Sequence, residues 1–287
     1  MRLDSASKRL VAMALREDLG KHGDLTTRFF LPAGKAFRAR IQAKAAGVFC
    51  GRAAAEEVFR LAAPRAALRW RKRDGDALRP GETIVEIRGG REILTAERPA
   101  LNFLQRLSGV ATATAAYARA LRGTRTRVYD TRKTLPGWRT LDKYAVRCGG
   151  GANHRMGLHD MILLKDNHLA GWTAEGAPAR ALRARVAAFR RRHPRVPIEI
   201  EAKTRAEVER ALDLGADIIL LDNMPPARLK REIALIRARA PRAGIEISGR
   251  VNLKTLPALA RLGADRISVG RITHSAPALD MSLELDA

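Results

Sequence analysis

Cysteine is scarce in this sequence: Cys50 and Cys148 are the only two among 287 residues. Two cysteines cannot form the disulfide framework of a small secreted protein, and they fit a reducing compartment. Long apolar runs are also missing, since no stretch approaches the roughly 20 residues of a membrane span. The first residues include basic ones but no apolar core of signal-peptide length. We therefore expect a cytoplasmic protein with no membrane partner.

Aromatic residues make up 5% of the chain, whereas Lys and Arg number 54 against 30 Asp and Glu, a net charge of +24. Such an excess suits nucleic acid, an anionic membrane, or small acidic substrates held by many cations. A nucleic-acid surface would interleave aromatic side chains with the basic ones. The aromatic residues here do not follow the charges, so we expect no nucleic-acid partner.

The first third of the chain predicts an α+β domain with an antiparallel sheet. Residues 37–44 alternate between apolar and polar, and residues 68–87 alternate again, interrupted by the turn signals Asp74-Gly75 and Pro80-Gly81. We expect Ser5 or Ser7 to cap a first helix and residues 24–27 to form a loop. Arg98 directly precedes Pro99, which predicts a helix start there.

From Arg127 onward, short apolar runs alternate with helical segments, the pattern of parallel strands joined by crossover helices. The runs are 128–129, 161–164, 198–200, 218–221, 245–247 and 267–269. A capping box at 204–207 marks the clearest helix start. Six countable strands, without a GxGxxG or GxxxxGK[ST] motif, favour an incomplete β/α barrel over a doubly wound nucleotide-binding sheet. We expect an N-terminal domain over residues 1–110, a barrel over 111–274, and a segment, 275–287, that packs back on the first domain.

Polar residues follow the runs at the strand ends where barrel active sites lie. They are Arg132, Lys133, Lys165, Glu201, Asp222, Ser248, Gly249 and Gly270. Glu201 and Asp222 close successive strands, so they could be paired ions, a general acid/base couple, or ligands of Mg²⁺. Ser248-Gly249 and Gly270 occupy the usual place of a barrel phosphate site. Lys133 and Lys165 could be Schiff-base lysines, although a permanently anionic ligand explains the whole cation group better.

Residues 129–168 concentrate cations around the glycine run 149–151, with His154 and Arg155 directly after it. A charge run is usually a solvated helix face, but these cations follow apolar runs and no helical stripe collects them. Glycines also let a backbone approach a ligand or adopt positive φ. We interpret the stretch as an anion-binding site.

These motifs resemble the quinolinate phosphoribosyltransferase family. The matching segments are DTRKTLPGWRTLDKYAVRCGGGANHRMGL, LLKDNH, EIEAK, IILLDN, EISGRVNL and ISVGRITHSAPALDMSLEL, together with DLTT at 24–27 and AERPALNFLQRLSGVAT before the barrel. The resemblance implies an enzyme of de novo NAD biosynthesis. It would convert quinolinate and phosphoribosyl pyrophosphate into nicotinate mononucleotide, pyrophosphate and CO2 with Mg²⁺. It also implies a homodimer or a dimer-based hexamer.

The resemblance further assigns roles to individual residues. Arg132, His154, Arg155 and Lys165 would bind the quinolinate carboxylates, with Arg98 entering from the partner subunit. Lys133, Glu201 and Asp222 would be catalytic and hold the ribose, the pyrophosphate and Mg²⁺, the two carboxylates directly or through water. Ser248, Gly249, Gly270 and His274 would bind the 5′-phosphate.

Overall fold

The structure is a computed structural model that describes residues 2–174 and 179–286. The chain forms two compact units, each built from several segments. Unit 1 comprises Met1–Ala116, Lys133–Gly151 and Arg271–Ala287, and unit 2 comprises Tyr117–Arg132 and Ala152–Gly270. The chain therefore leaves and re-enters each unit, while the division expected after residue 110 stays a prediction.

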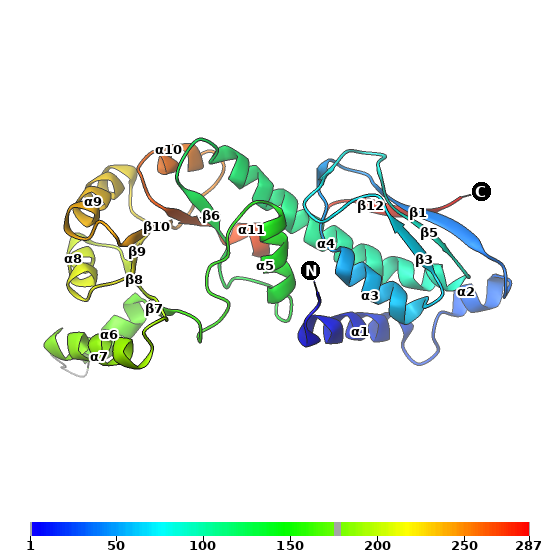
Figure 1. Ribbon diagram of the computed structural model, residues 1–287, viewed down its shortest axis with the longest axis horizontal. Helices are drawn as coiled ribbons and strands as arrows, with labels where there is room; N and C mark the ends of the chain where they lie inside the picture. The colour runs from blue at the N-terminus through cyan, green and yellow to red at the C-terminus, as the bar shows by residue number, and fades with distance from the viewer. Residues whose placement is uncertain (1, 175–178, 287) are drawn as a thin grey trace. The chain divides into compact units, whose positions relative to one another are not determined.

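Unit 1 contains a four-stranded antiparallel sheet in the order β12-β1-β5-β3 (Figure 1). Its strands are β1 (Phe37–Ala43), β3 (Ala67–Trp70), β5 (Thr83–Gly89) and β12 (Met281–Leu285). A separate antiparallel pair joins β2 (Gly47–Val48) to β4 (Ala77–Leu78). The antiparallel sheet expected from the alternation is confirmed. Its edge strand β12 comes from the end of the chain and pairs with β1, with Ile41 opposite Leu283.

Two short-range expectations for unit 1 are wrong in the same way. Helix α1 (Ser5–Leu19) is capped by Asp4, whose carboxylate accepts from Ser7 N at 2.7 Å, and not by Ser5 or Ser7. Helix α2 (Leu25–Phe30) replaces the loop expected at 24–27, and Asp24 caps it through Thr27 N at 2.9 Å. In both places an Asp satisfies an amide that the helix itself leaves unpaired.

Helix α4 (Glu92–Ala120) contains Pro99 in its interior, so the helix start expected at Arg98 is wrong. A proline there removes one backbone hydrogen bond and normally destabilises a helix. Apolar burial on both sides of the proline outweighs that cost: Ile93, Leu101, Leu104 and Leu107 are all buried. Helix α3 (Arg52–Ala62) also belongs to this unit.

The glycine run follows helix α5 (Arg139–Cys148) and has a packing role within unit 1. A Cβ on Gly149 would lie 2.3 Å from the Ala111 carbonyl oxygen, and one on Gly151 would lie 2.7 Å from Thr114 Cγ2. Gly150 adopts φ 84°. Only glycine lets this segment pack so closely against α4 and turn back at Gly150.

Unit 2 contains a six-stranded parallel sheet in the order β6-β11-β10-β9-β8-β7. Its strands are β6 (Arg127–Tyr129), β7 (Ile162–Leu164), β8 (Ile198–Ala202), β9 (Ile218–Asp222), β10 (Gly244–Ser248) and β11 (Arg266–Ser268). The first strand pairs with the last, as in a closed barrel. No ladder joins β6 to β7 in the described part of the chain, where β6 forms instead an isolated bridge from Tyr129 to Ala152. The expected incomplete barrel is confirmed.

Helices connect the parallel strands (Figure 1). They are α6 (Asp166–Ala174), α7 (Ala179–Arg192), α8 (Arg205–Asp213), α9 (Pro226–Arg239) and α10 (Leu256–Ala260), and α11 (Arg271–His274) follows β11 as part of unit 1. The capping box of Thr204 and Glu207 is present at α8 as expected. None of the helices within residues 2–174 and 179–286 is both long and apolar enough to cross a membrane.

The strand register determines which side chains share one face of the parallel sheet. Glu201 and Glu246 are both paired with Leu220, and Asp222 is paired with Ser248. Paired residues on neighbouring parallel strands point to the same side, and residues two apart along a strand do too. Glu199, Glu201, Asp222, Glu246 and Ser248 therefore lie on one face, the interior of the barrel.

Candidate active site

The carboxyl ends of β8, β9 and β10 bring Glu201, Asp222 and Ser248 together, as the sequence predicted for barrel strand ends. Asp222 accepts from the side-chain amide of Asn223 at 2.9 Å. The Glu201 side chain is 10% exposed, so its charge is held in a largely dry position. Charged groups at such a position interact more strongly than they would in water.

Two lysines flank Glu201. Lys165 Nζ lies 3.5 Å from one carboxylate oxygen, and Lys203 Nζ lies 3.7 Å from the other. Lys203 also donates to Asp166 at 2.6 Å, and this hydrogen bond raises the pKa of Lys203, with smaller contributions from Glu201 and Asp222. Both lysine side chains are almost half exposed. The strand ends thus bring a nearly buried acid together with two half-exposed cations.

Arg132 and Arg155 form a second cationic pair. Arg155 donates to the Met161 carbonyl at 3.1 Å. Burial lowers the pKa of the Arg155 guanidinium, and the charge of Arg132 lowers it further. Arg132 Nε is buried and has no hydrogen-bond partner among the described residues. A buried donor left unpaired is costly, so this pair is suited to an anion that would accept from it.

His154 lies in a buried cluster with two glutamates that the sequence analysis did not single out. His154 Nε2 lies 3.0 Å from Glu199 Oε2 and 3.5 Å from Glu246 Oε1, and both carboxylates are fully buried. The backbone amide of Arg155 donates to His154 Nδ1 at 2.8 Å, which assigns the ring proton of a neutral imidazole to Nε2. The amide of His154 itself donates to Asp130 at 2.8 Å. The imidazole therefore lies between the backbone amide of Arg155, which hydrogen-bonds to it, and the two buried carboxylates.

Two buried carboxylates so close together cannot both ionise easily. Burial raises the pKa of Glu246 to about 7, and the charge of Glu199 contributes in the same direction. The nearest atoms of His154, Glu199 and Glu246 lie within 4.8 Å of one another, a spacing that a metal ion could also use. A proton held by Glu246, whose pKa is raised, relieves the repulsion between the two carboxylates without a metal.

The turns after β9 and β10 contain backbone conformations that L-residues rarely adopt. Gly249 has φ 96°, and Arg250 and Asn223 have φ 47° and 53°. A Cβ on Gly249 would lie 2.3 Å from Asn223 Oδ1, so only glycine fits there. Asn223 N donates to the Ser248 carbonyl at 3.0 Å and joins the two turns. Strained, closely packed turns of this kind are frequent at ligand sites.

Three predicted site residues belong to unit 1: Arg98, Lys133 and His274. Arg98 lies on α4 with its side chain 58% exposed and 3.9 Å from Glu97. The Lys133 carbonyl accepts from Thr273 Oγ1 at 2.8 Å, next to His274, whose Nδ1 lies 2.6 Å from Ser275 Oγ. Gly270 ends unit 2 directly after β11. The assigned roles of these residues stay predictions.

Sequence reasoning missed Lys203, Asn223, Glu199 and Glu246. The signal for the glutamates was present, because a charged residue at every second position of an apolar strand indicates a polar barrel interior. Lys203 follows Glu201 by two residues at the end of β8, so it belongs to the same strand-end group. Asn223 directly follows Asp222.

A Glu246→Gln substitution tests the buried cluster. The pKa of Glu246 is about 7 in the folded chain against an ordinary value of 4.5, so folding favours the protonated carboxyl. This contribution to the stability of the wild type is complete below about pH 4.5 and is lost as the pH rises through 7. The glutamine cannot ionise, so from pH 5 to pH 8 the variant should gain stability relative to wild type by roughly 2–3 kcal/mol, at about 1.4 kcal/mol per pKa unit. Urea unfolding of the variant and the wild type at pH 5 and pH 8 measures this difference in the free energy of unfolding.

The matched control is Glu232→Gln. Glu232 is another buried glutamate of unit 2, and it forms an ion pair with Arg205 at 3.1 Å. This variant should be less stable than wild type at both pH values. A constant difference between Glu246→Gln and wild type from pH 5 to pH 8 would contradict the raised pKa.

The chain matches family models over both of its parts. Residues 24–108 match the N-terminal domain of quinolinate phosphoribosyl transferase, and residues 110–284 match its C-terminal domain. It is 40% identical over 280 residues to a probable nicotinate-nucleotide pyrophosphorylase [carboxylating] of Bacillus subtilis, covering 97% of this chain and 93% of the relative. It is 39% identical to the nicotinate-nucleotide pyrophosphorylase [carboxylating] of Mycobacterium leprae, covering 98% and 97%.

Solved structures agree with the sequence relatives. The nicotinate-nucleotide pyrophosphorylase from Francisella tularensis superposes with a TM-score of 0.90 at 33% identity, over 100% of this chain and 98% of that one. The fold, the strand-end charges and the full-length similarity lead to one assignment. The chain belongs to the quinolinate phosphoribosyltransferase family.

Proposed function

We propose that this chain transfers the phosphoribosyl group of phosphoribosyl pyrophosphate to the nitrogen of quinolinate. The products are nicotinate mononucleotide, pyrophosphate and CO2, as required in de novo NAD biosynthesis. The observation that carries this proposal is the match of both family domains along residues 24–284, with relatives about 40% identical over nearly the whole chain. The strand-end cations and acids supply the chemistry that such a reaction needs.

Arg132, Arg155 and Lys165 would bind the two carboxylates of quinolinate. A planar guanidinium matches a carboxylate with two parallel hydrogen bonds, and the unpartnered Nε of Arg132 is a donor that a carboxylate would satisfy. His154 would contribute beside Arg155, with its ring held by Glu199 at 3.0 Å. The low exposure of this region favours binding of a dianion because water competes weakly there.

Glu201 and Asp222 would take part on the phosphoribosyl side. Their two carboxylates at adjacent strand ends are the hard oxygen donors that suit Mg²⁺, so the residues present fit that ion. When bound, Mg²⁺ would neutralise charge on the pyrophosphate. The phosphates would be bound by Lys133, Ser248, Gly249, Gly270 and His274. The turn at Gly249 supports this role because only glycine can adopt its conformation, as in other turns whose backbone amides bind phosphate.

The transfer step forms a bond from the quinolinate nitrogen to the ribose anomeric carbon and breaks the bond from that carbon to pyrophosphate. Positive charge develops on the anomeric carbon, and the Glu201 carboxylate would stabilise it electrostatically. The 2-carboxylate then leaves as CO2. Its bonding electrons stay on the ring carbon, next to the positively charged nitrogen, and that carbon takes up a proton. Lys165 Nζ lies 3.5 Å from Glu201, so Lys165 would keep the bound quinolinate aligned with the Glu201 carboxylate.

We also infer that the active form is a homodimer, alone or within a hexamer, in which Arg98 enters the neighbouring site. Arg98 supports this because its side chain is more than half exposed and its nearest carboxylate, on Glu97, lies at 3.9 Å. An exposed arginine with so loose a partner is available to a second chain.

The product assay tests the proposed reaction. The purified chain with quinolinate, phosphoribosyl pyrophosphate and Mg²⁺ should release nicotinate mononucleotide and CO2 in equal amounts, detected by chromatography and by trapping labelled CO2. Chelating the metal should abolish turnover. Nicotinate replaces quinolinate in the control, and equal turnover of nicotinate, or none of quinolinate, would refute the function.

Substitutions separate binding from chemistry. Arg155→Ala should raise the quinolinate KM by about 10- to 100-fold, since a hydrogen bond to a charged group contributes roughly 1.5–3 kcal/mol. Glu201→Ala should mainly lower kcat, by about 100-fold, the typical scale for losing one group that stabilises transition-state charge. Arg191→Ala, an exposed residue of α7, is the control. Unchanged kinetics in both variants would remove the site assignment.

Mixing two defective variants tests the shared site. If Arg98 acts in the neighbouring protomer, an equal mixture of Arg98→Ala and Arg155→Ala chains rebuilds one intact site in each mixed dimer, so activity should recover to about a quarter of wild type. Two variants of one protomer's own site, Arg132→Ala and Arg155→Ala, provide a comparison in which each mixed dimer would still carry one defect per site. No recovery in the first mixture would contradict the Arg98 assignment.

A further inference from the structure

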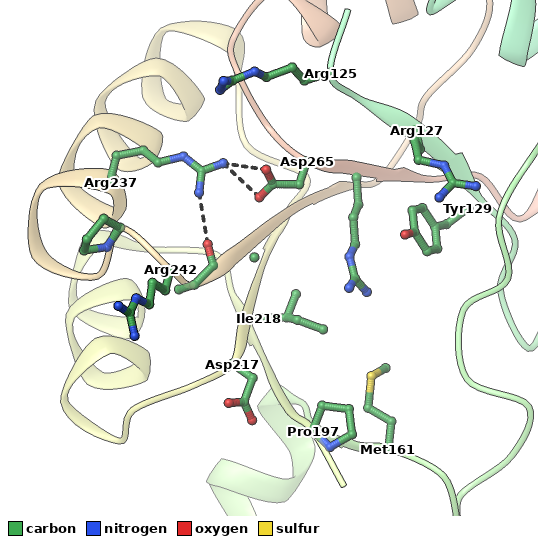
Figure 2. Close-up of a pocket in the computed structure, with 14 residues that line it drawn as sticks. Arg125, Arg127, Tyr129, Met161, Pro197, Asp217, Ile218, Arg237, Arg242 and Asp265 are labelled. Atoms are coloured by element: carbon green, nitrogen blue, oxygen red, sulfur yellow. Dashed lines mark hydrogen bonds and ion pairs between the residues drawn. The ribbon is translucent and has the colours of Figure 1, made fainter. Parts of the chain in front are cut away.

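The opposite end of the barrel, at the amino ends of its strands, contains a cavity of about 620 Å³ (Figure 2). Arg127, Ile218, Gly244 and Arg266 each begin a strand of the parallel sheet and line it, and Pro197 lines it just before β8. Glu201, Asp222 and Ser248 lie at the other ends of β8, β9 and β10. The cavity is therefore separate from the candidate active site, and its volume is in the range of small-molecule sites.

Arginine dominates the lining of this cavity: five arginines face two aspartates. They are Arg125, Arg127, Arg237, Arg242 and Arg266, with Asp217 and Asp265. Figure 2 shows the side chains of four labelled arginines, on β6, on α9 and on the loops that precede β6 and β10, at separate places around the cavity. Such a collection of like charges is unfavourable unless anions are present.

The two aspartates are already engaged by other groups. Asp265 accepts from Arg237 at 2.8 Å and from the amide of Ile245 at 2.8 Å. Asp217 accepts from Arg190, outside the cavity, at 3.1 Å and from the amide of Ile198 at 2.8 Å. Both carboxylates hold strand starts in place, so neither is available to the remaining arginines.

Three of the five arginines that line the cavity have no partner among the described residues. Arg125, Arg127 and Arg242 have no hydrogen-bond or ion-pair partner within residues 2–174 and 179–286, and all three are exposed. The guanidinium of Arg266 lies 4.9 Å from the centre of the Tyr129 ring, a cation–π contact. Because Arg266 covers that ring, Tyr129 is a poor platform for stacking a base.

Some exposed arginines elsewhere in the chain are paired. On the antiparallel sheet, Arg40 pairs with Asp286 at 2.5 Å and Arg71 pairs with Glu86 at 2.6 Å. Others, such as Arg185 and Arg231, are exposed and have no hydrogen-bond or ion-pair partner among the described residues, so the lack of a partner alone does not define a site. Arg125, Arg127 and Arg242 are set apart because all three line one cavity, whose lining also includes the buried apolar side chains of Met161 and Ile218.

We propose that the amino-terminal mouth of the barrel binds a small oligophosphate through Arg125, Arg127 and Arg242. Phosphate oxygens match the fork of donors that a guanidinium presents, and linked phosphates supply several negative charges within one cavity. The shared chemistry is a chain of two or more phosphates, which inorganic polyphosphate and a nucleoside triphosphate both carry. This inference does not rest on the proposed transferase activity.

Isothermal titration of the full chain with inorganic tripolyphosphate tests the proposal. An Arg132→Ala/Lys133→Ala/Arg155→Ala/Lys165→Ala background removes the cations of the proposed quinolinate and phosphoribosyl pyrophosphate subsites at the other end of the barrel. In that background binding should persist, and adding Arg127→Gln and Arg242→Gln should weaken it at least tenfold. Far-UV circular dichroism checks that the variants fold, and the single Arg242→Gln, in the loop before β10, should show a smaller loss in the same direction.

The matched control removes the same charge at Arg185 and Arg231, exposed residues of α7 and α9 away from the cavity. It should bind tripolyphosphate within about twofold of its parent. A parallel titration with ATP identifies the source: tighter binding of ATP supports a nucleotide, and equal or weaker binding supports an inorganic chain. Absence of binding by both probes, or equal losses in the mouth and control variants, would overturn the proposal.

Discussion

The parallel pairing of β8, β9 and β10 is the constraint on which the rest of unit 2 depends. It places Glu201 and Glu246 beside Leu220, and Asp222 beside Ser248, so charged residues from three strands share the barrel interior. A register shift of one residue would turn every one of these side chains to the outer face. The apolar residues between them, Ile200, Ile219 and Ile245 among others, are fully buried and maintain the register.

The charges in the barrel form layers along its axis. Arg132 and Arg155 form one cationic pair, and Lys165 with Lys203 flanks Glu201 at the strand ends. Below them Glu199 and Glu246 surround His154, and at the other mouth the arginines collect again. Each buried acid therefore has a cation or a proton nearby, which the cost of burying an isolated charge requires. This alternation explains how a chain with a net charge of +24 holds ionised side chains inside a barrel.

The strands could be predicted from the sequence because each is a short apolar run between polar segments, and all six runs became strands. The strand-end residues followed from the rule that barrel sites lie there. Other features could not be read so directly. Pro99 indicates a helix start by local preference alone, but burial of Ile93 and Leu101 on either side extends α4 through it.

The remaining misses also have physical causes. The glycine run predicted approach to a ligand or a positive φ, and Gly150 has φ 84°, but the packing of Gly149 and Gly151 against α4 joins segments far apart in sequence and was not foreseen. The alternation of charged and apolar residues in β8 and β10 indicates an interior position for Glu199 and Glu246, but only the three-dimensional register places both beside His154. Arg127 and Arg242 were not predicted as site residues because a functional site was expected only at the carboxyl ends of the strands. Three-dimensional register and packing, and not local pattern, determine all of these.

The most direct test of the account is a crystal structure of the chain with quinolinate bound. We expect a pyridine ring whose carboxylates lie within hydrogen-bond distance of Arg132 and Arg155, with the ring nitrogen facing Glu201 and Asp222. Quinolinate bound away from both arginines, or with its nitrogen turned from the acid pair, would contradict it.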